Sequence, residues 1–252
     1  MRRRPRPGHA YARSMLTGDE SWLPDELTLA GRENLDAAHV ERYDRKEDAE
    51  GAAEVAAVFD FGLCADPTVI EFGPGTGQFT IEMAPRAAAV YAVDVSPVML
   101  DRLNKNLASR EITNVATVRA GFLTYQHQGP PADLVYSRYA LHHLPDFWKA
   151  LALARIAGLL KPGGLFRLWD VVYSFDSTEA PQAVENWMTA VGGASISDEW
   201  VRDELEEHVR DEHSTFSWLL EPMITRVGFV IERADSSADR ICAKYVCRKP
   251  AP

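Results

Sequence analysis

Short runs of β-forming residues alternate with longer helical runs from residue 68 onward, and this rhythm constrains the fold more than any other feature of the chain. The β-type runs are TVIEF, AVYAVDV, VATVRAGF, ADLVYSRY and LFRLWDVVY. Helices that connect successive strands imply crossover connections, and these produce a parallel sheet with both faces covered. The sequence therefore predicts an α/β, doubly wound fold.

The segments on either side of this core lack its rhythm. Residues 1–50 are expected to form a flexible basic tail and a helical N-terminal lid, and residues 51–252 the core with a helical insertion at about 174–213. Within the insertion, DEWVRDELEEHVRDE has one apolar stripe and many acids, which predicts an amphipathic helix with a solvated face. A helix, STFSWLLEPMITRVGF, and two strands, VIERA and RICAKYVCRK, are predicted to close the chain.

The charge of the chain disfavours a nucleic-acid partner. The formal net charge is -10, although the first thirteen residues carry five arginines and no acid. The remainder is therefore more acidic than the whole, and an acidic body repels the phosphates that Lys and Arg would otherwise neutralise.

The cysteine pattern and the hydropathy predict a cytoplasmic protein. Cys64, Cys242 and Cys247 form no C-x-x-C pair and leave an odd count, which disfavours disulfides and a structural metal and fits a reducing compartment. No apolar stretch after the basic start is long enough for a signal-peptide core or a membrane span. We expect no membrane partner, and either a monomer or a homodimer.

Three glycines mark the turn after the first strand, in VIEFGPGTGQFT. Open parallel sheets bind ligands beyond the carboxyl ends of their strands, and Gly73, Gly75 and Gly77 stand at that place. A dinucleotide fingerprint needs a third glycine where this chain has Gln78, and a Walker loop needs a lysine that the turn lacks. Both phosphate-binding interpretations are weakened.

The spacing E-x-G-x-G-x-G, together with an acid at the end of the next strand in VYAVDVS, resembles the class I S-adenosylmethionine-dependent methyltransferases. The motifs VIEFGPGTG, VDVSPVML, DLVYSRYALHHL and LKPGG are similar to those of a bacterial small-molecule branch that includes quinone-biosynthesis methyltransferases. The resemblance covers about residues 50–173 and, more weakly, the closing helix and strands. It implies a Rossmann-like, mostly parallel seven-stranded sheet with an antiparallel last strand and helical lid segments.

The resemblance implies that S-adenosylmethionine is the cofactor. This molecule has no phosphate, so its site needs hydrogen-bond acceptors and contact surface. Asp94 would accept from both ribose hydroxyls, and Glu71 would orient the turn and the ammonium of the methionine tail, through water. The other implied contacts are Gly73, Pro74, Gly75, Thr76 and Gly77 around the methionine part, Val95 and Met99 on the adenine face, and Phe122 at its edge.

Two parts of the implied cofactor site, the adenine contact and the N-terminal segment, match the family pattern less well. Many family members have an acid before the residue equivalent to Phe122, where it holds the adenine amino group, but here RAGF has Gly121. A backbone group is one alternative for that contact. In the N-terminal segment, Tyr43 and Lys46 are expected to fold over the cofactor, with Lys46 pairing with its carboxylate; a solvated helix face is the alternative.

The residues after the fourth strand lie nearest the transferred methyl group in this family. Methyl transfer is an in-line displacement, so the enzyme mainly aligns the acceptor and excludes water. Tyr139, His142 and His143 stand there as candidate catalytic residues, because a histidine near its ordinary pKa can take a proton from a phenol, a carboxylic acid or an amine. In the alternative, LHHL packs and caps the strand–helix junction.

Several acceptor classes lack their usual residues. SRYA replaces the Asn/Asp-Pro-Pro-aromatic run of base amino-methylation, no Pro-Cys pair is available for base C5 methylation, and only Asp170 fits metal-assisted catechol chemistry. The sequence thus predicts no metal and a small-molecule acceptor, methylated on oxygen, nitrogen or carbon. Tryptophans in the predicted lids either line an apolar acceptor pocket or simply pack there: Trp22, Trp187, Trp200 and Trp218.

Two other functions are weighed against methyl transfer. One is a regulatory protein that binds S-adenosylmethionine without catalysis. The other is a nicotinamide-dependent oxidoreductase, which the missing third glycine and the absence of a Tyr-x-x-x-Lys pair disfavour.

Overall fold

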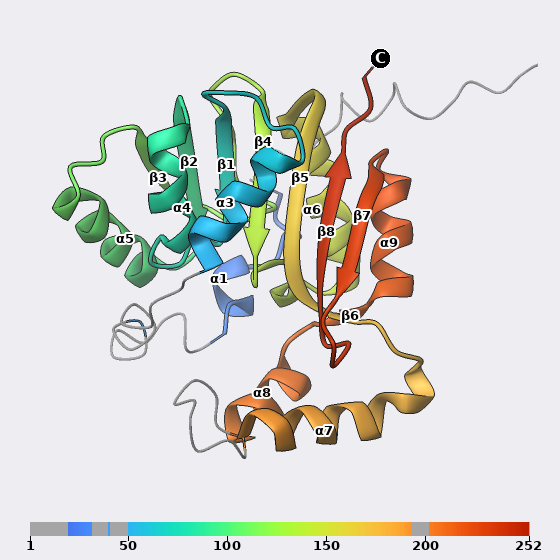
Figure 1. Cartoon of the computed structure of the whole chain (residues 1–252). Coiled ribbons are helices and arrows are strands. Elements are labelled where there is room, and N and C mark those ends of the chain that lie inside the picture. The colour runs from blue at the N-terminus through green and yellow to red at the C-terminus, as the bar shows by residue number, and fades with distance from the viewer. Residues whose placement is uncertain (1–19, 32–39, 41–49, 193–201, 252) are drawn as a thin grey trace, which may run out of the picture.

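The computed structural model describes residues 20–31, 40, 50–192 and 202–251. These residues form one mixed sheet in the order β3-β2-β1-β4-β5-β8-β7, with the short β6 paired to β5 (Figure 1). The strands are β1 (Thr68–Phe72), β2 (Ala89–Asp94), β3 (Val115–Arg119), β4 (Ala132–Arg138), β5 (Leu160–Tyr173), β6 (Thr215–Phe216), β7 (Val230–Ser236) and β8 (Cys242–Arg248).

The sheet confirms the predicted fold class. Strands β1 to β5 pair in parallel, and the last strand, β8, runs antiparallel to both of its neighbours. The described residues hold eight strands where the sequence predicts seven, because the two-residue β6 adds to the end of β5.

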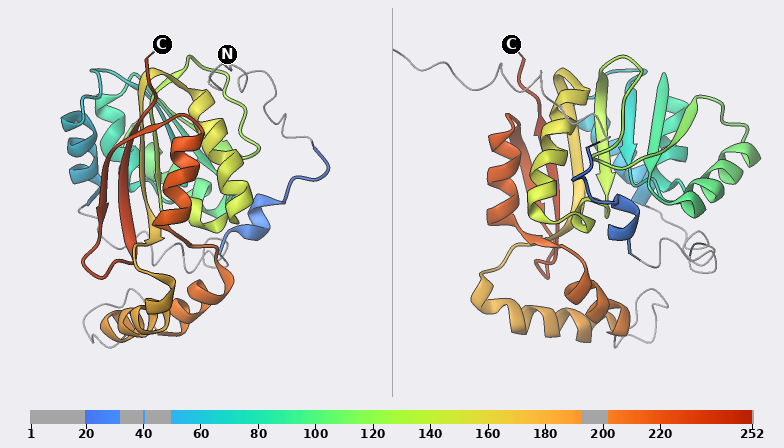
Figure 2. Two further views of the ribbon diagram at one scale, coloured as in Figure 1. Left: turned by 90° about the vertical axis from the view of Figure 1, so that its right-hand side faces the viewer. Right: turned by 180° about the vertical axis from the view of Figure 1, so that it is seen from behind.

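Helices cover both faces of the sheet, as Figures 1 and 2 show. The α-helices are α1 (Glu26–Leu29), α3 (Glu50–Asp60), α4 (Gln78–Met83), α5 (Pro97–Ser109), α6 (Asp146–Leu159), α7 (Ala180–Gly192), α8 (Arg202–Asp211) and α9 (Ser217–Arg226). Short 3-10 turns are η4 (Ala84–Arg86), η5 (Leu141–His143) and η6 (Ser177–Glu179). Within the described part of the chain, no helix combines the length and apolar character needed to cross a bilayer.

Alternation along β1 divides the hydrophobic core into two layers. Val69 packs with side chains of α3 and α4, whereas Ile70 and Phe72 pack with side chains of α6 and α9. On the α4 face the rings of Phe79 and Tyr136 stack with centroids 3.7 Å apart. The two layers fix the strand ends from which the candidate site is built.

The LKPGG motif lies between α6 and the body of β5. KPGG lies within the bounds of β5 instead of before it. Gly163 takes a φ of 81°, and the pairing with β4 shifts register between Ala132 and Leu134. The Gly163 amide still donates to the carbonyl of Lys249 at 2.8 Å, so the glycines bend the backbone without ending its hydrogen bonding to the last strand.

Two helices lie beyond the sheet at one end. α7 and α8 contact each other, and Figure 1 draws them on the side toward which the arrow of β4 points. They fall within the insertion predicted at about residues 174–213. The carboxyl ends of the parallel strands, where α/β proteins bind ligands, therefore face this helix pair.

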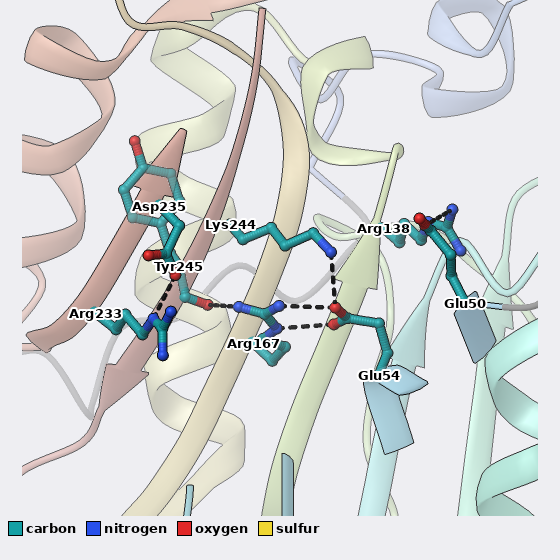
Figure 3. A network of polar contacts seen from close by, with 8 residues as sticks. All are labelled: Glu50, Glu54, Arg138, Arg167, Arg233, Asp235, Lys244 and Tyr245. Atoms are coloured by element: carbon teal, nitrogen blue, oxygen red, sulfur yellow. Dashed lines mark hydrogen bonds and ion pairs between the residues drawn. The ribbon is translucent and has the colours of Figure 1, made fainter. Parts of the chain in front are cut away.

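A buried ion network attaches α3 to the sheet (Figure 3). Glu54 accepts two hydrogen bonds from the guanidinium of Arg167, at 2.9 and 2.8 Å, and a third from Lys244 at 3.1 Å. The side chains of Glu54 and Arg167 are each 5% exposed. Burial opposes ionisation of Glu54, but Arg167 and Lys244 hold its pKa below the ordinary value. The bidentate pair fixes the position of α3 across β5 and β8.

Glu54→Gln is expected to destabilise the fold by about 3 kcal/mol, because it leaves the buried Arg167 charge without its partner. The free energy of unfolding in guanidinium chloride measures this loss. Glu232→Gln, which breaks a more exposed pair with Arg248, is the matched control and is expected to cost no more than about 1 kcal/mol. Equal small losses in both variants would contradict the role given to Glu54.

Candidate functional site

The turn between β1 and α4 has the backbone that its three glycines allow. Gly73, Gly75 and Gly77 have φ values of 71°, 56° and 107°. A Cβ on Gly73 would lie 2.4 Å from Cβ of Ala140, so no larger residue fits there. The Gly73 amide donates to the carbonyl of Val93 at 3.0 Å, which holds the turn against the end of β2.

Asp94 ends β2 beside this turn, as the sequence predicts. Its Oδ1 accepts a hydrogen bond from the Ser96 amide at 2.8 Å. Burial raises the pKa of Asp94 to about 6, although backbone hydrogen bonds from Ser96, Gly75 and Val95 lower it. The side chain is only partly buried. A carboxylate held by backbone amides at a strand end is suited to accept hydrogen bonds from hydroxyl groups.

Glu71 is a buried acid with few groups around it that stabilise its negative charge. It is 3% exposed and accepts a hydrogen bond from the Thr80 hydroxyl. Burial raises the pKa of Glu71 to about 8, the Thr80 bond opposes this shift, and the neighbouring Asp94 carboxylate adds to it. A ligand ammonium at this end of the turn would supply the positive charge that favours the ionised form.

The other predicted cofactor residues surround the same strand ends. Pro74 and Thr76 are buried in the turn, and the Thr76 carbonyl accepts from the Asn106 amide group at 3.0 Å. Ser96 caps α5 by accepting a hydrogen bond from the Met99 amide. Further members of the predicted set lie as follows: Val95 is partly buried, Met99 is 3% exposed, Phe122 stacks on Phe72 at 4.6 Å, and Tyr43 and Lys46 lie outside the described residues.

Glu26 lies beside the predicted cofactor residues, although the sequence did not predict it there. It begins α1 and reaches the loop after β3, where it accepts from the Leu123 amide at 3.1 Å and from the Thr124 hydroxyl at 3.0 Å. A Cβ on Gly121 would lie 2.3 Å from its carboxylate. The glycine thus makes room for an acid brought from the N-terminal segment. Burial raises the pKa of Glu26, and the hydrogen bonds from this loop lower it.

Tyr139 follows β4 with a φ of 50°, a conformation that non-glycine residues adopt rarely. Its amide donates to the Trp169 carbonyl at 2.9 Å. Its ring packs in a cluster defined by Val171, Phe175 and Ile241, to which Tyr173, Phe216 and Trp187 also belong. Burial raises the pKa of Tyr139, so its phenol stays protonated at neutral pH and is available as a hydrogen-bond donor.

His142 and His143 lie in η5 and contact the segment after α8. His142 Nδ1 is 2.5 Å from Asp170 Oδ1, and its Nε2 is 2.8 Å from Glu212 Oε2. Burial alone lowers the pKa of His142, but Asp170 and Glu212 raise it to about 10. Burial and the His142 charge lower the pKa of His143 to about 3. The catalytic roles of Tyr139, His142 and His143 stay predictions.

The predicted lid tryptophans do not lie together in the structure. Trp22 stacks on Trp148 of α6 at 5.9 Å, outside the cluster around Tyr139. Trp187 packs in that cluster, and Trp218 stacks on Phe216 with 54% of its surface exposed. Trp200 lies outside the described residues. Of the predicted lid tryptophans, Trp187 and Trp218 therefore lie by the aromatic rings near the end of β5, where Trp169 of β5 also packs against Tyr139 with ring centroids 5.4 Å apart.

The arrangement fits a nucleoside with a charged amino-acid tail. It offers a strained glycine turn for close approach, one carboxylate for hydroxyl groups, a buried carboxylate for an ammonium, and a third carboxylate at Gly121. The turn contains no cation, so it lacks a partner for a phosphate charge. These features match the donor groups of S-adenosylmethionine, which has hydroxyls, an ammonium and an exocyclic amine.

Comparison with known proteins finds methyltransferase relatives. A family model described as a methyltransferase domain matches residues 69–164. An uncharacterized methyltransferase of Geobacillus kaustophilus is 32% identical over 182 residues, which span 69% of this chain and 82% of the relative. The sequence therefore matches most of the length of that relative.

Solved structures share the fold at low identity. A SAM-dependent methyltransferase from Aquifex aeolicus has a TM-score of 0.61 and 14% identity, covering 85% of this chain and 99% of its own. The N-methyltransferase NodS from Bradyrhizobium japonicum, solved with S-adenosyl-L-homocysteine, has a TM-score of 0.59 and 16% identity, covering 90% of this chain and 98% of its own.

The raised pKa of Glu71 predicts a pH-dependent stability for the ligand-free protein. The folded state holds the proton up to about pH 8, whereas the unfolded state releases it near the ordinary value of 4.5, so stability falls as pH rises between these values. Glu71→Gln removes this contribution, and its stability should fall less between pH 5 and pH 8. Guanidinium unfolding at several pH values tests this, with the exposed Glu82→Gln as control. Parallel profiles for wild type and Glu71→Gln would refute it.

Proposed function

This chain belongs to the class I S-adenosylmethionine-dependent methyltransferases, and from that premise we propose that it methylates a small, partly apolar or aromatic molecule. The enzyme class and the cofactor follow from the family and confirm the prediction made from the glycine turn. The acceptor class is the proposed part. The observation that carries the cofactor assignment is the contact between the Gly73 turn and the end of β2 at Asp94.

The proposed roles of the turn residues follow from their chemistry. Asp94 would accept from the two ribose hydroxyls, and Glu71 would hold the ammonium of the methionine tail. The bound cofactor supplies an electrophilic methyl group on its sulfonium. The protein orients this group and excludes water, which is the main requirement of an in-line displacement.

We assign Glu26 to the adenine end of the cofactor. Its carboxylate lies against Gly121, the position at which many relatives are expected to carry their own acid. The Leu123 amide and the Thr124 hydroxyl fix its orientation. A carboxylate has about four acceptor positions, so it can bind both these donors and an exocyclic amine.

The aromatic cluster around Tyr139 supports an apolar or aromatic acceptor. Tyr139, Tyr173, Phe216 and Trp187 gather where β4 and β5 end, next to the lid helix α7. Rings in this position can pack on a flat organic molecule. The net charge of -10 disfavours a nucleic-acid acceptor. A cytoplasmic location, and action as a monomer or homodimer, stay part of the proposal; the free cysteines Cys64, Cys242 and Cys247 fit a reducing compartment.

A panel of acceptors with methyl-labelled S-adenosylmethionine tests the acceptor class. Small phenols, aromatic carboxylic acids and aromatic amines are expected to accept label, and single- or double-stranded nucleic acid is not. Tyr139→Phe is expected to lower kcat/KM by about tenfold if its hydroxyl donates to the acceptor, a loss of about 1.4 kcal/mol. Labelling of nucleic acid alone would contradict the proposal.

Glu26 and Gly121 predict a reciprocal rescue. Glu26→Ala removes one charged hydrogen bond and should weaken binding of S-adenosylhomocysteine by about tenfold or more. Gly121→Asp alone should also bind poorly, because its side chain would meet the Glu26 carboxylate. The double variant Glu26→Ala/Gly121→Asp places the acid on the loop itself and should regain affinity.

Calorimetric titration measures all three variants, and circular dichroism checks that each one folds. Asp25→Ala, which alters the cap of α1 next to Glu26, is the control for loss of the helix itself. A double variant that binds more weakly than both single variants would exclude an adenine contact by Glu26.

A further inference from the structure

We propose that His142, His208 and Glu212 form a binding site for one divalent metal ion of the zinc type, which joins the helix α8 segment to the core. One nitrogen of each histidine and one Glu212 oxygen lie within 4.8 Å of one another. Two imidazoles and a carboxylate are the ligand set of many zinc sites. The site goes beyond methyl transfer, and it departs from the prediction of no metal made from the sequence.

The three ligands are close and shielded from water. His142 Nε2 is 2.8 Å from Glu212 Oε2, and His208 Nδ1 is 2.6 Å from the same oxygen. His142 and His208 are each 5% exposed. Ligand atoms around a tetrahedral zinc ion lie roughly 3.4 Å apart, given bond lengths of about 2.1 Å. Small rotations of the side chains would open the cluster to that spacing.

Each histidine is held through its other ring nitrogen. Asp170 Oδ1 contacts Nδ1 of His142, and Oδ2 of the same carboxylate accepts from the His142 amide at 3.0 Å. Ser214 Oγ is 2.9 Å from Nε2 of His208. This is the outer shell that metal-binding histidines usually have, because such a partner fixes the ring and its tautomer. Both ligating nitrogens are thereby turned toward Glu212.

Two buried polar atoms of the cluster have no hydrogen-bond partner among the described residues. One is Glu212 Oε2, whose contacts with His142 at 2.8 Å and His208 at 2.6 Å are ion pairs. The other is Nδ1 of His143, which lies 3.9 Å from that oxygen. Buried polar atoms are normally satisfied, so two such atoms together indicate a missing partner. A metal ion would bind Oε2 and leave His143 or water as the fourth ligand.

The charges of the cluster also suit a divalent cation. Asp170 is 2% exposed and the Glu212 side chain is 14% exposed, so two carboxylates share a poorly solvated space. The buried ammonium of Lys149 in the same region is engaged by Asp146 and by the carbonyl of His213. An ion of charge +2 would balance both carboxylates with neutral imidazoles as ligands.

The site would connect segments that are distant in sequence. His142 follows β4 in the core, whereas His208 and Glu212 belong to α8 and the residue after its end. The His213 amide also donates to the His142 carbonyl at 3.1 Å. The ion would therefore fix the α7–α8 pair over the carboxyl ends of the strands, next to the aromatic cluster (Figure 1).

Metal analysis of untagged, full-length protein tests the site. After dialysis against zinc and then against metal-free buffer, mass spectrometry should find one zinc ion per chain. Replacement of zinc by Co²⁺ should give visible absorption bands of a tetrahedral nitrogen and oxygen site. His208→Gln and Glu212→Gln should each weaken zinc binding at least tenfold, and Asp170→Asn by about 10- to 100-fold.

His213→Gln is the matched control, because this histidine adjoins Glu212 but has an exposed side chain. It should retain zinc as the wild type does. Circular dichroism and S-adenosylhomocysteine affinity, measured on the same samples, show whether each variant is folded. Substoichiometric zinc in the wild type, or equal zinc affinity in folded Glu212→Gln, would overturn the metal site. Loss of S-adenosylhomocysteine binding with zinc retained would instead count only against the proposed cofactor site.

Discussion

The absence of a side chain at Gly73 is the constraint on which the rest of the site depends. Ala140, which follows β4, approaches so closely that a Cβ on Gly73 would lie 2.4 Å from its own. This contact and the hydrogen bond from the Gly73 amide to Val93 bring the ends of β1, β2 and β4 to one point. Asp94, Glu71 and Tyr139 thereby lie around a single turn, and the proposed cofactor site rests on that arrangement.

Local signals in the sequence predicted the part of the site that local backbone geometry determines. The glycine spacing predicted the turn, and the motif VYAVDVS predicted an acid, Asp94, at the end of the neighbouring strand. The alternation of elements predicted the mostly parallel sheet, and the family resemblance implied the antiparallel last strand. The strand that contains LFRLWDVVY begins earlier than this run, because the glycines of KPGG bend β5 without ending its hydrogen bonds.

Contacts between distant segments could not be predicted in the same way. Glu26 lies 97 residues from Leu123 in the chain, and nothing in ELTL distinguishes it from a solvated helix acid. His208 lies in α8 and Glu212 just after it, in a segment whose many acids indicated a solvated face, yet His208 is buried together with the predicted apolar stripe. In both cases a polar side chain enters the core because a partner from another segment receives it. Such pairs become visible only when the tertiary structure brings the segments together.

The most direct test of the account is calorimetric titration of S-adenosylhomocysteine into wild type, Asp94→Ala and the exposed control Asp101→Ala. The account predicts that Asp94→Ala loses about 100-fold or more in affinity, because two charge-assisted hydrogen bonds of about 1.5–3 kcal/mol each are removed. Asp101→Ala, on the solvent face of α5, should bind as the wild type does. Unchanged affinity in a folded Asp94→Ala variant would contradict the assignment of the glycine turn and Asp94 as the cofactor site.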